Sequence, residues 1–502
     1  MVPMTTPPKT SARVAGAPEA AKATNTAKAD ADKVAADKVA AKAIKARATK
    51  SASSTKSASS TKASAKATLP AQAGRTRSTS PAPANWASGE GIAPRDGAGR
   101  WSGRGGGRGR GIYNRQLQRA NERWPIGARV LSWVFRRPEL LLALLGRPAP
   151  IRADGRVMHR GVQAVLETMT RLEGVLGGGD TEADLRNPAV MRKQMQHIAL
   201  YTMPIRTDVH VVERVIPVAA GAKPSKGIPV RVYRRFGTGV GAAVGLGSRP
   251  PAIVYFHGGG WANGDLVSHD PSCRLLAAVS GCVVVAVDYR LAPEDPFPAA
   301  VEDALAAYRW VHGHAEELGI AEGQVGVMGD SAGGNLAAVV ALLTRDGAPT
   351  PGFLAPATSG VPAPIAQGLV YPGLSTRFDS ESVRLFGEGF FLTERSMIAY
   401  RGAYLPDQAD WELGEASPLL AEDVDGVAPA LVVTAGFDPL RDDGDAYAKR
   451  LEQAGVAVEY RCYDDQVHGF FGMGFLADSL ALSIEVCDAM GRMMHRDRPE
   501  PG

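Results

Sequence analysis

From residue 205 onward, short apolar runs rich in β-branched residues alternate with longer stretches of helical periodicity. One of these runs, in "PAIVYFHGGGW" (251–261), follows a Gly-rich loop, and the next, "CVVVAVDYR" (282–290), is almost unbroken. Unbroken apolar runs are typical of strands that helices cover on both faces. Strands are predicted at 209–218, 228–236, 251–256, 282–290, 324–328, 366–371, 430–435 and 456–463, and helices at 298–318, 333–343, 444–454 and 475–495. This order predicts an α/β fold with a mostly parallel central sheet flanked by helices, in which ligands bind beyond the carboxyl ends of the strands.

Two regions interrupt the alternation, and we interpret both as parts of a helical cap. Residues 111–204 are largely helical in pattern, and residues 376–415 form an insertion between two strands. Both are expected to cover the carboxyl edge of the sheet. We therefore expect a helical extension and cap over 111–204, and a catalytic domain over 205–502 with a cap insertion at about 376–415.

The first 110 residues form a basic tail of a different composition. They hold 20 Lys and Arg against 6 Asp and Glu, a net charge of +14, whereas the whole chain carries +5. The tail is rich in Ala, Lys and Ser and then in Gly and Arg, with too little apolar surface to offset the entropy of ordering, so we expect disorder. Its charge suits weak binding to nucleic acid or another polyanion, although a solvated tail without a partner is the simpler interpretation.

Neither a secretory signal nor a transmembrane segment is predicted. The tail has no apolar core of the kind that signal peptides carry, and no run of eighteen apolar residues occurs in the chain. Four cysteines in so long a chain do not make a disulfide framework. The expected location is therefore the cytoplasm, where thiols stay reduced.

One segment before the first strand is unusually apolar. In "IGARVLSWVFRRPELLLALLGR" (126–147), apolar side chains gather around Trp133 and Phe135, arginines interrupt them, and Pro138 is expected to break or kink the helix. The segment is too short and too charged to span a bilayer. We expect it to pack on the cap; the alternative is contact with a lipid interface through its apolar face.

The stretch "VGVMGDSAGGNL" (325–336) places Ser331 between a predicted strand and a predicted helix. Gly329 and Gly333 lie two residues to either side of Ser331, where a side chain would collide in a sharp strand-to-helix turn. In this context the G-x-S-x-G pattern indicates a nucleophile held at the end of a strand. The five-residue pattern alone fits an ordinary glycine-rich turn equally well.

A serine hydroxyl needs a base, and the base needs a third group that orients it. His468 is the candidate base, because it follows the strand predicted at 456–463. Asp438 is the candidate acid, because it follows the apolar run 430–435. Asp442 and Asp443 compete for this role, but we expect them to cap the helix predicted near residue 444. The chain order Ser, Asp, His is that of the α/β-hydrolase triad.

The sequence "HGGGW" (257–261) follows a predicted strand and offers bare backbone that a substrate can approach. Backbone N–H groups in such a loop, with the one that follows the nucleophile, make an oxyanion hole. The alternative is a flexible glycine loop without a function, which fits poorly because a histidine and a tryptophan flank the glycines. Supporting positions are assigned to His257 and Asp330. The predicted oxyanion hole comprises Gly258, Gly259, Gly260 and Ala332.

Together, "HGGGW" (257–261), "YRLAPE" (289–294), "GDSAGGN" (329–335), "DPLRDD" (438–443) and "HGF" (468–470) resemble the hormone-sensitive-lipase-like family of α/β-hydrolases over about residues 205–495. The resemblance implies ester hydrolysis through an acyl-enzyme, with no metal and no organic cofactor, and a cap built largely from residues before the first strand. Carried over by motif, Ser331 is the nucleophile, Asp438 the acid and His468 the base. Gly258 shapes the turn and His257 braces the loop, and the oxyanion N–H groups come from Gly259, Gly260 and Ala332.

We therefore expect a serine hydrolase that cleaves small-molecule carboxylic esters of short to medium acyl chain. An amide, carbamate or lactone hydrolase would use the same triad, and assays with those substrates would separate the two. A non-catalytic ligand-binding or scaffold protein on the same fold is the other alternative. Such proteins usually lose a catalytic residue, and none is missing from this sequence.

Overall fold

The computed structural model describes residues 130, 133–135, 137–176, 185, 187–218, 224, 226–236, 249–345 and 360–496. The predicted tail 1–110 lies outside these described residues. Across the described ranges, no helix combines the length and the apolarity that crossing a membrane requires.

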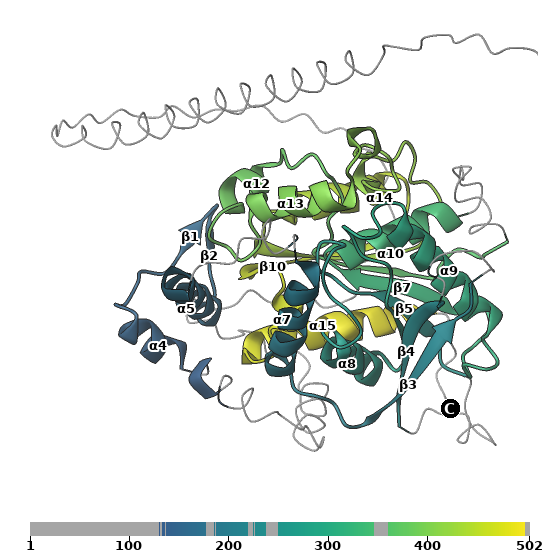
Figure 1. The fold of residues 1–502 in the computed structure, drawn as a ribbon, viewed down its shortest axis with the longest axis horizontal. Coiled ribbons are helices and arrows are strands. Elements are labelled where there is room, and N and C mark those ends of the chain that lie inside the picture. Colours follow the sequence, from purple (N-terminus) through teal and green to yellow (C-terminus); the bar gives the residue numbers. More distant parts are fainter. Residues whose placement is uncertain are drawn as a thin grey trace, which may run out of the picture. The chain divides into compact units, whose positions relative to one another are not determined.

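The core of the protein is an eight-stranded sheet with the strand order β10-β9-β8-β7-β5-β6-β4-β3 (Figure 1). β4 pairs antiparallel with β3 and β6, and every other pair is parallel. This arrangement confirms the predicted mostly parallel sheet. The strands are β3 (Val209–Ile216), β4 (Ile228–Arg235), β5 (Ala252–Phe256), β6 (Val283–Val287), β7 (Val325–Asp330), β8 (Gln367–Val370), β9 (Ala430–Phe437) and β10 (Val458–Val467).

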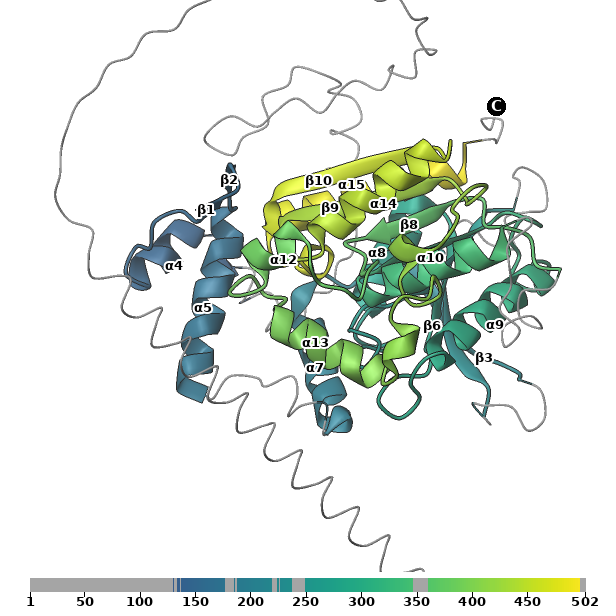
Figure 2. The same cartoon turned by 90° about the horizontal axis from the view of Figure 1, so that it is seen from above.

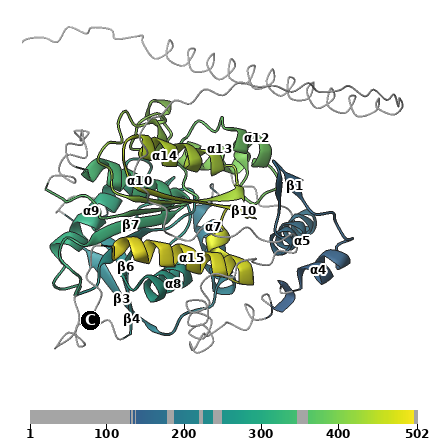
Figure 3. The same cartoon turned by 180° about the vertical axis from the view of Figure 1, so that it is seen from behind.

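Helices cover both faces of the sheet, which explains the unbroken apolar runs. Along β5, Val254 and Phe256 join the core on one face, and Ile253 and Tyr255 join the core on the other. All four side chains are fully buried. One face carries α9 (Ala299–Gly313), α10 (Ala332–Thr344) and α14 (Arg441–Gln453), and the other carries α8 (Asp270–Ser280) and α15 (Ala477–Met494), as Figure 3 shows.

Within the described residues of 111–204 and 376–415, the two regions predicted to form a cap contain five helices. They also contain a two-stranded antiparallel hairpin of β1 (Arg152–Ala153) and β2 (Arg156–Val157), which the helical pattern did not predict. Pro138 is the first residue of α4, where its missing N–H costs no helical hydrogen bond. The helices are α4 (Pro138–Leu144), α5 (Arg160–Leu176), α7 (Pro188–Thr202), α12 (Glu381–Phe386) and α13 (Glu394–Tyr404); short 3-10 turns are η1 (Gln408–Asp410), η2 (Pro418–Leu420) and η3 (Phe470–Gly472).

The cap segments α4 and α5 pack onto the catalytic domain through one apolar cluster. Phe135, Leu142 and Val162 share this cluster with Phe437 and Val467, the last residues of β9 and β10. Phe386 of α12 belongs to it as well, so both cap regions meet there. In Figure 2, α4 and α5 lie side by side, and α12 lies between α5 and the ends of these two strands.

Candidate active site

Ser331 occupies the sharp turn between β7 and α10, with φ 54° and ψ −119°. Residues other than glycine rarely adopt this backbone conformation, and it occurs chiefly at functional sites. A Cβ at Gly329 would collide with the carbonyl of Gly333, and a Cβ at Gly333 would collide with the carbonyl of Phe256. The turn therefore requires both glycines, and the Ser331 N–H holds it by donating to Val370 O at 2.8 Å.

The structure brings the three predicted triad residues together. His468 follows the last residue of β10, which runs four residues further than predicted, and Asp438 follows the last residue of β9. His468 Nε2 lies 3.0 Å from Ser331 Oγ, and His468 Nδ1 lies 2.9 Å from Asp438 Oδ2. The Leu440 N–H donates to Asp438 Oδ1 at 2.8 Å, and the Asp438 side chain is fully buried. The carboxylate is thus fixed against the imidazole, with its second oxygen already occupied.

The two competing carboxylates do not reach His468 through any hydrogen bond among the described residues, and neither caps the helix as predicted. α14 begins at Arg441 with Leu440 at its N-cap, so Asp442 and Asp443 lie inside its first turn. Asp442 Oδ2 accepts from the Ser382 N–H at 2.8 Å. Burial and the neighbouring carboxylates raise the pKa of Asp443 to about 7.

The glycine loop after β5 has the backbone freedom that an oxyanion hole needs. Gly259 and Gly260 have φ values of 123° and 61°. A Cβ at Gly259 would collide with the carbonyl of Asn263, and a Cβ at Gly260 would collide with the ring of Tyr400. Within the described part of the chain, the amides of Gly259, Gly260 and Ala332 donate to no acceptor. Two N–H groups of the glycine loop and the one that directly follows Ser331 are therefore free to donate to a negatively charged oxygen.

The fourth predicted donor is engaged elsewhere. The Gly258 N–H donates to Asp330 Oδ1 at 3.0 Å, and the Tyr255 hydroxyl donates to the same oxygen at 2.6 Å. The other carboxylate oxygen, Oδ2, lies 3.7 Å from His269 Nε2. Burial disfavours the charged form of Asp330, but His269 and the hydrogen bonds outweigh it, so the pKa of Asp330 is lowered. Asp330 thus fixes the start of the glycine loop, and Gly258 shapes the turn.

His257 is a neutral brace for the same loop. Its Nδ1 lies 2.9 Å from Gly258 O, so Nδ1 carries the proton and donates it. Its ring stacks on Tyr289 with a centroid separation of 4.3 Å, and the Tyr289 hydroxyl donates to His257 O at 2.7 Å. Burial, with His269 nearby, lowers the pKa of His257 to about 4. The imidazole is therefore uncharged at neutral pH, and its Nδ1 proton is engaged by the loop and not by the triad.

Cap residues approach the site from both cap regions. Arg192 of α7 donates to Ala262 O at 3.0 Å and to Ala292 O at 2.9 Å, and it pairs with both carboxylate oxygens of Glu294. Trp261, directly after the glycine loop, stacks on Tyr404 of α13 with a centroid separation of 4.6 Å. The loop that contains the free amides is thus held by α7 on one side and by α13 on the other.

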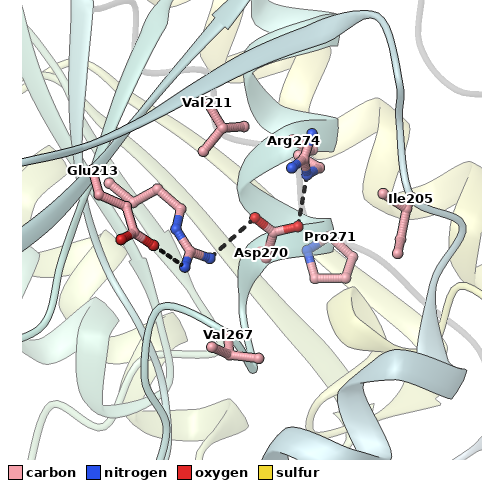
Figure 4. A pocket seen from close by; sticks show the side chains of 8 residues that line it. Ile205, Val211, Glu213, Val267, Asp270, Pro271 and Arg274 are labelled. Atoms are coloured by element: carbon pink, nitrogen blue, oxygen red, sulfur yellow. Dashed lines mark hydrogen bonds and ion pairs between the residues drawn. The ribbon is translucent and has the colours of Figure 1, made fainter.

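A separate hollow of about 440 Å³ lies between β3, β4 and the start of α8 (Figure 4). Its charged side chains neutralise one another: Arg231 pairs with Glu213 at 2.7 Å and with Asp270 at 3.2 Å, and Asp270 pairs with Arg274 at 2.6 Å. This network fixes the first turn of α8, and His269 immediately precedes that turn. The ion pairs that line the hollow therefore help to hold His269, the histidine that faces Asp330, in position.

The groups gathered around Ser331 are a hydroxyl, an imidazole, a carboxylate and backbone amides. This set can take a proton from a hydroxyl, return it to a leaving group and stabilise an oxyanion. Among the residues that the structure describes, no group of three or more His, Cys, Asp or Glu side chains is placed to hold a metal ion. Sequence reasoning missed the supporting residues Tyr255, His269 and Arg192, because no local motif marks them. Tyr289 begins the motif "YRLAPE", but the motif alone did not indicate its role.

Comparisons with known proteins identify relatives of this chain. A family model described as the alpha/beta hydrolase fold matches residues 253–472. The carboxylic ester hydrolase LipN of Mycobacterium tuberculosis is 41% identical over 354 residues, which are 69% of this chain and 85% of LipN. An ethyl acetate hydrolase of Pseudomonas putida is 39% identical over 227 residues, which are 45% of this chain and 68% of that protein.

Solved structures show the same fold. A thermostable esterase from Pseudomonas putida has a TM-score of 0.58 and 31% identity, covering 68% of this chain and 99% of that chain. An ester hydrolase from the metagenome of Lake Arreo, complexed with a bipyridine phosphonate derivative, has a TM-score of 0.57 and 36% identity, covering 66% of this chain and 98% of that chain. The chain belongs to the hormone-sensitive-lipase-like family of α/β-hydrolases and is a hydrolase of the carboxylesterase type.

Proposed function

We propose that the protein hydrolyses carboxylic esters of short to medium acyl chain through an acyl-enzyme on Ser331. The observation that carries this proposal is the continuous hydrogen-bonded line from Ser331 Oγ through His468 to Asp438, with distances of 3.0 and 2.9 Å. The amides of Gly259 and Gly260, in the loop after β5, and of Ala332, directly after the serine, are free of other acceptors among the described residues. In the proposed reaction they donate to the carbonyl oxygen of an ester bound at Ser331 Oγ.

In the first half of the reaction, Ser331 Oγ bonds to the ester carbonyl carbon while His468 Nε2 takes the hydroxyl proton. The amides of Gly259, Gly260 and Ala332 hold the oxyanion, and the Asp438 carboxylate stabilises the imidazolium. The bond from carbon to the alkoxy oxygen then breaks, and His468 Nε2 gives its proton to the leaving alcohol. Water repeats the sequence on the acyl-enzyme, which releases the acid and restores the Ser331 hydroxyl.

The preference for a short to medium acyl chain rests on the aromatic residues that cover the site. Tyr400 lies against Gly260, and Phe391 lies against Gly469, next to His468. The name of the Pseudomonas putida relative, ethyl acetate hydrolase, supports a small acyl group in this chain as well. We also place the protein in the cytoplasm, because all four cysteines are free thiols.

Steady-state kinetics with p-nitrophenyl esters of increasing acyl length test this function. We expect kcat/KM to be highest for short to medium chains, and Ser331→Ala and His468→Ala to lower kcat by several powers of ten while both variants stay folded. A folded Ser331→Ala variant within tenfold of the wild type would refute the assignment. If an aryl amide, carbamate or lactone is turned over faster than any ester, the triad assignment stands and the proposed substrate class is wrong.

A further inference from the structure

The described residues of the segment 126–147, which are 130, 133–135 and 137–147, have apolar side chains in two different surroundings. Phe135 and Leu142 are 8% and 1% exposed, and the ring of Phe135 lies 5.4 Å from that of Phe475. In contrast, Trp133 and Leu140 are 60% and 56% exposed, and Leu144 is 78% exposed. Packing on the cap therefore accounts for only one of these two groups of side chains.

We call three of the exposed side chains, Trp133, Leu140 and Leu144, the α4 patch. Leu140 and Leu144 are four residues apart on α4, so they share a face of the helix, and the buried Leu142 points away from it. In Figure 1, α4 lies at the edge of the described structure, with α5 as its neighbour. Leaving two leucines in water forgoes a favourable burial, which points to a partner for this face.

The charges around the α4 patch are basic. Arg137 is exposed and its guanidinium lies 5.1 Å from the ring centroid of Trp133, and Arg147 is exposed at the end of α4. The nearby acid, Glu139, is already paired with Arg160 at 2.8 Å. The Glu139 side chain is 70% exposed, but its charge is balanced by Arg160, so Arg137 and Arg147 leave a net positive charge around the patch.

The whole N-terminal part of the chain has the same sign. Residues 111–150 contain seven Arg and two Glu, a net charge of +5, in addition to the +14 of residues 1–110. Because the whole chain carries +5, residues 151–502 carry −14. An apolar surface that combines tryptophan and leucine with a basic surround matches a membrane interface that contains anionic lipid.

We propose that the α4 patch docks the protein on an anionic lipid surface. Leu140 and Leu144 enter the boundary between headgroups and acyl chains, Trp133 lies at the level of the headgroups, and Arg137 and Arg147 contact lipid phosphates. The docked segment is not remote from the hydrolase site. Its buried face shares an apolar cluster with Phe437 and Val467, which immediately precede Asp438 and His468.

Flotation of the full chain with vesicles tests the proposal. The vesicles contain phosphatidylcholine with or without phosphatidylglycerol, and about 1 M salt is used to screen the basic tail, since the Debye length is then ~3 Å. At this salt concentration, where the tail no longer contributes, we expect the double variant Leu140→Ser/Leu144→Ser to partition onto the anionic vesicles at least about tenfold more weakly than the wild type. The matched control Val215→Ser/Phe236→Ser removes two side chains that are 57% and 60% exposed on the β3–β4 hairpin, and it should bind as the wild type does.

A second measurement does not depend on the folding of the double variant. Quenching of tryptophan fluorescence by brominated lipid should be largely lost in Trp133→Phe, which isolates Trp133 from the other six tryptophans. Equal vesicle binding by the wild type and the leucine variant, or equal quenching in Trp133→Phe, would overturn the proposal and assign binding to the tail. A wild-type dimer that the leucine variant converts to a monomer, with no vesicle binding, would overturn it in favour of self-association.

Discussion

Replacing Asp330 by Asn removes a buried charge from beneath the glycine loop while keeping a side chain of the same shape. Asp330 Oδ1 accepts hydrogen bonds from the Gly258 N–H at 3.0 Å and from the Tyr255 hydroxyl at 2.6 Å. An amide oxygen can still accept both, but without the negative charge that strengthens them. The variant therefore weakens the attachment of the loop and leaves the triad intact.

The size of the effect follows from the two hydrogen bonds. Bonds to a charged group contribute about 1.5–3 kcal/mol each, and neutral bonds about 0.5–1.5 kcal/mol. The exchange therefore costs about 1–1.5 kcal/mol per bond, or roughly 2–3 kcal/mol for both. Part of this cost appears as lower stability, and part as poorer alignment of the amides of Gly259 and Gly260. Because loss of a whole oxyanion donor costs about 10²–10³ in kcat, we expect Asp330→Asn to lower kcat by about tenfold to a hundredfold.

The assay compares kcat, KM and thermal stability for p-nitrophenyl butyrate. KM should change little, because the oxyanion forms only in the transition state. Asp303→Asn is the control for loss of a buried charge: Asp303 accepts from Arg290 at 2.8 Å and makes no hydrogen bond to residues 257–261 among the described residues. If kcat falls no further in Asp330→Asn than in Asp303→Asn, Asp330 acts only through general stability and the reasoning is refuted.

Three further outcomes are expected. The pKa of Asp443, raised to about 7, lies above its unfolded value, so stability from this group is present at low pH and is lost as pH rises toward 7. Melting curves of Asp443→Asn should therefore show a gain over the wild type at about pH 8 that disappears near pH 4. The pKa of His257, lowered to about 4, lies below its unfolded value, so stability of about 3 kcal/mol is lost as pH falls from about 6.5 to about 4. His257→Asn should flatten that acid decline, and an unchanged slope would contradict the buried neutral ring. Arg192→Lys cannot reproduce the forked bonds to Glu294 and two carbonyls. We therefore expect kcat/KM to fall about tenfold and hydrogen exchange in α7 to accelerate. Lys449→Arg, on the exposed face of α14, is the control and should leave both quantities unchanged.

The elements that sequence reasoning predicted well are those with a local cause. β5 and β6 are buried on both faces, and a strand in that position has to be apolar throughout. The turn at Ser331 needs glycine two residues before and two residues after it, because a Cβ at either position would collide with neighbouring backbone. The positions of Asp438 and His468 followed from the rule that parallel strands end at a common edge, and the structure places both side chains in hydrogen-bonded line with the serine.

The features that escaped prediction depend on contacts between distant parts of the chain. Tyr255 and Asp330 are 75 residues apart, and their hydrogen bond exists only because β5 and β7 are neighbours in the sheet. The early start of α14 is another example, since Asp442 accepts from Ser382 of the cap insertion and is not needed as a cap. Arg192 bonds to carbonyl groups 70 and 100 residues away, and no pattern around it in the sequence indicates that partnership.

The segments predicted to form the cap contact the elements of the candidate site at two places, one beside the proposed oxyanion loop and one beside the proposed acid and base. Arg192 of α7 holds the loop that carries the oxyanion amides, because it donates to the carbonyl of Ala262. The cluster of α4 and α5 packs on the strand ends that carry the acid and the base, through Phe437 and Val467. A displacement of α7 should therefore disturb oxyanion binding first, and a displacement of α4 should disturb proton transfer first. Because α4 is also the segment with the exposed patch, docking of that patch on lipid would act on the acid–base half of the site and leave the oxyanion loop under the control of α7.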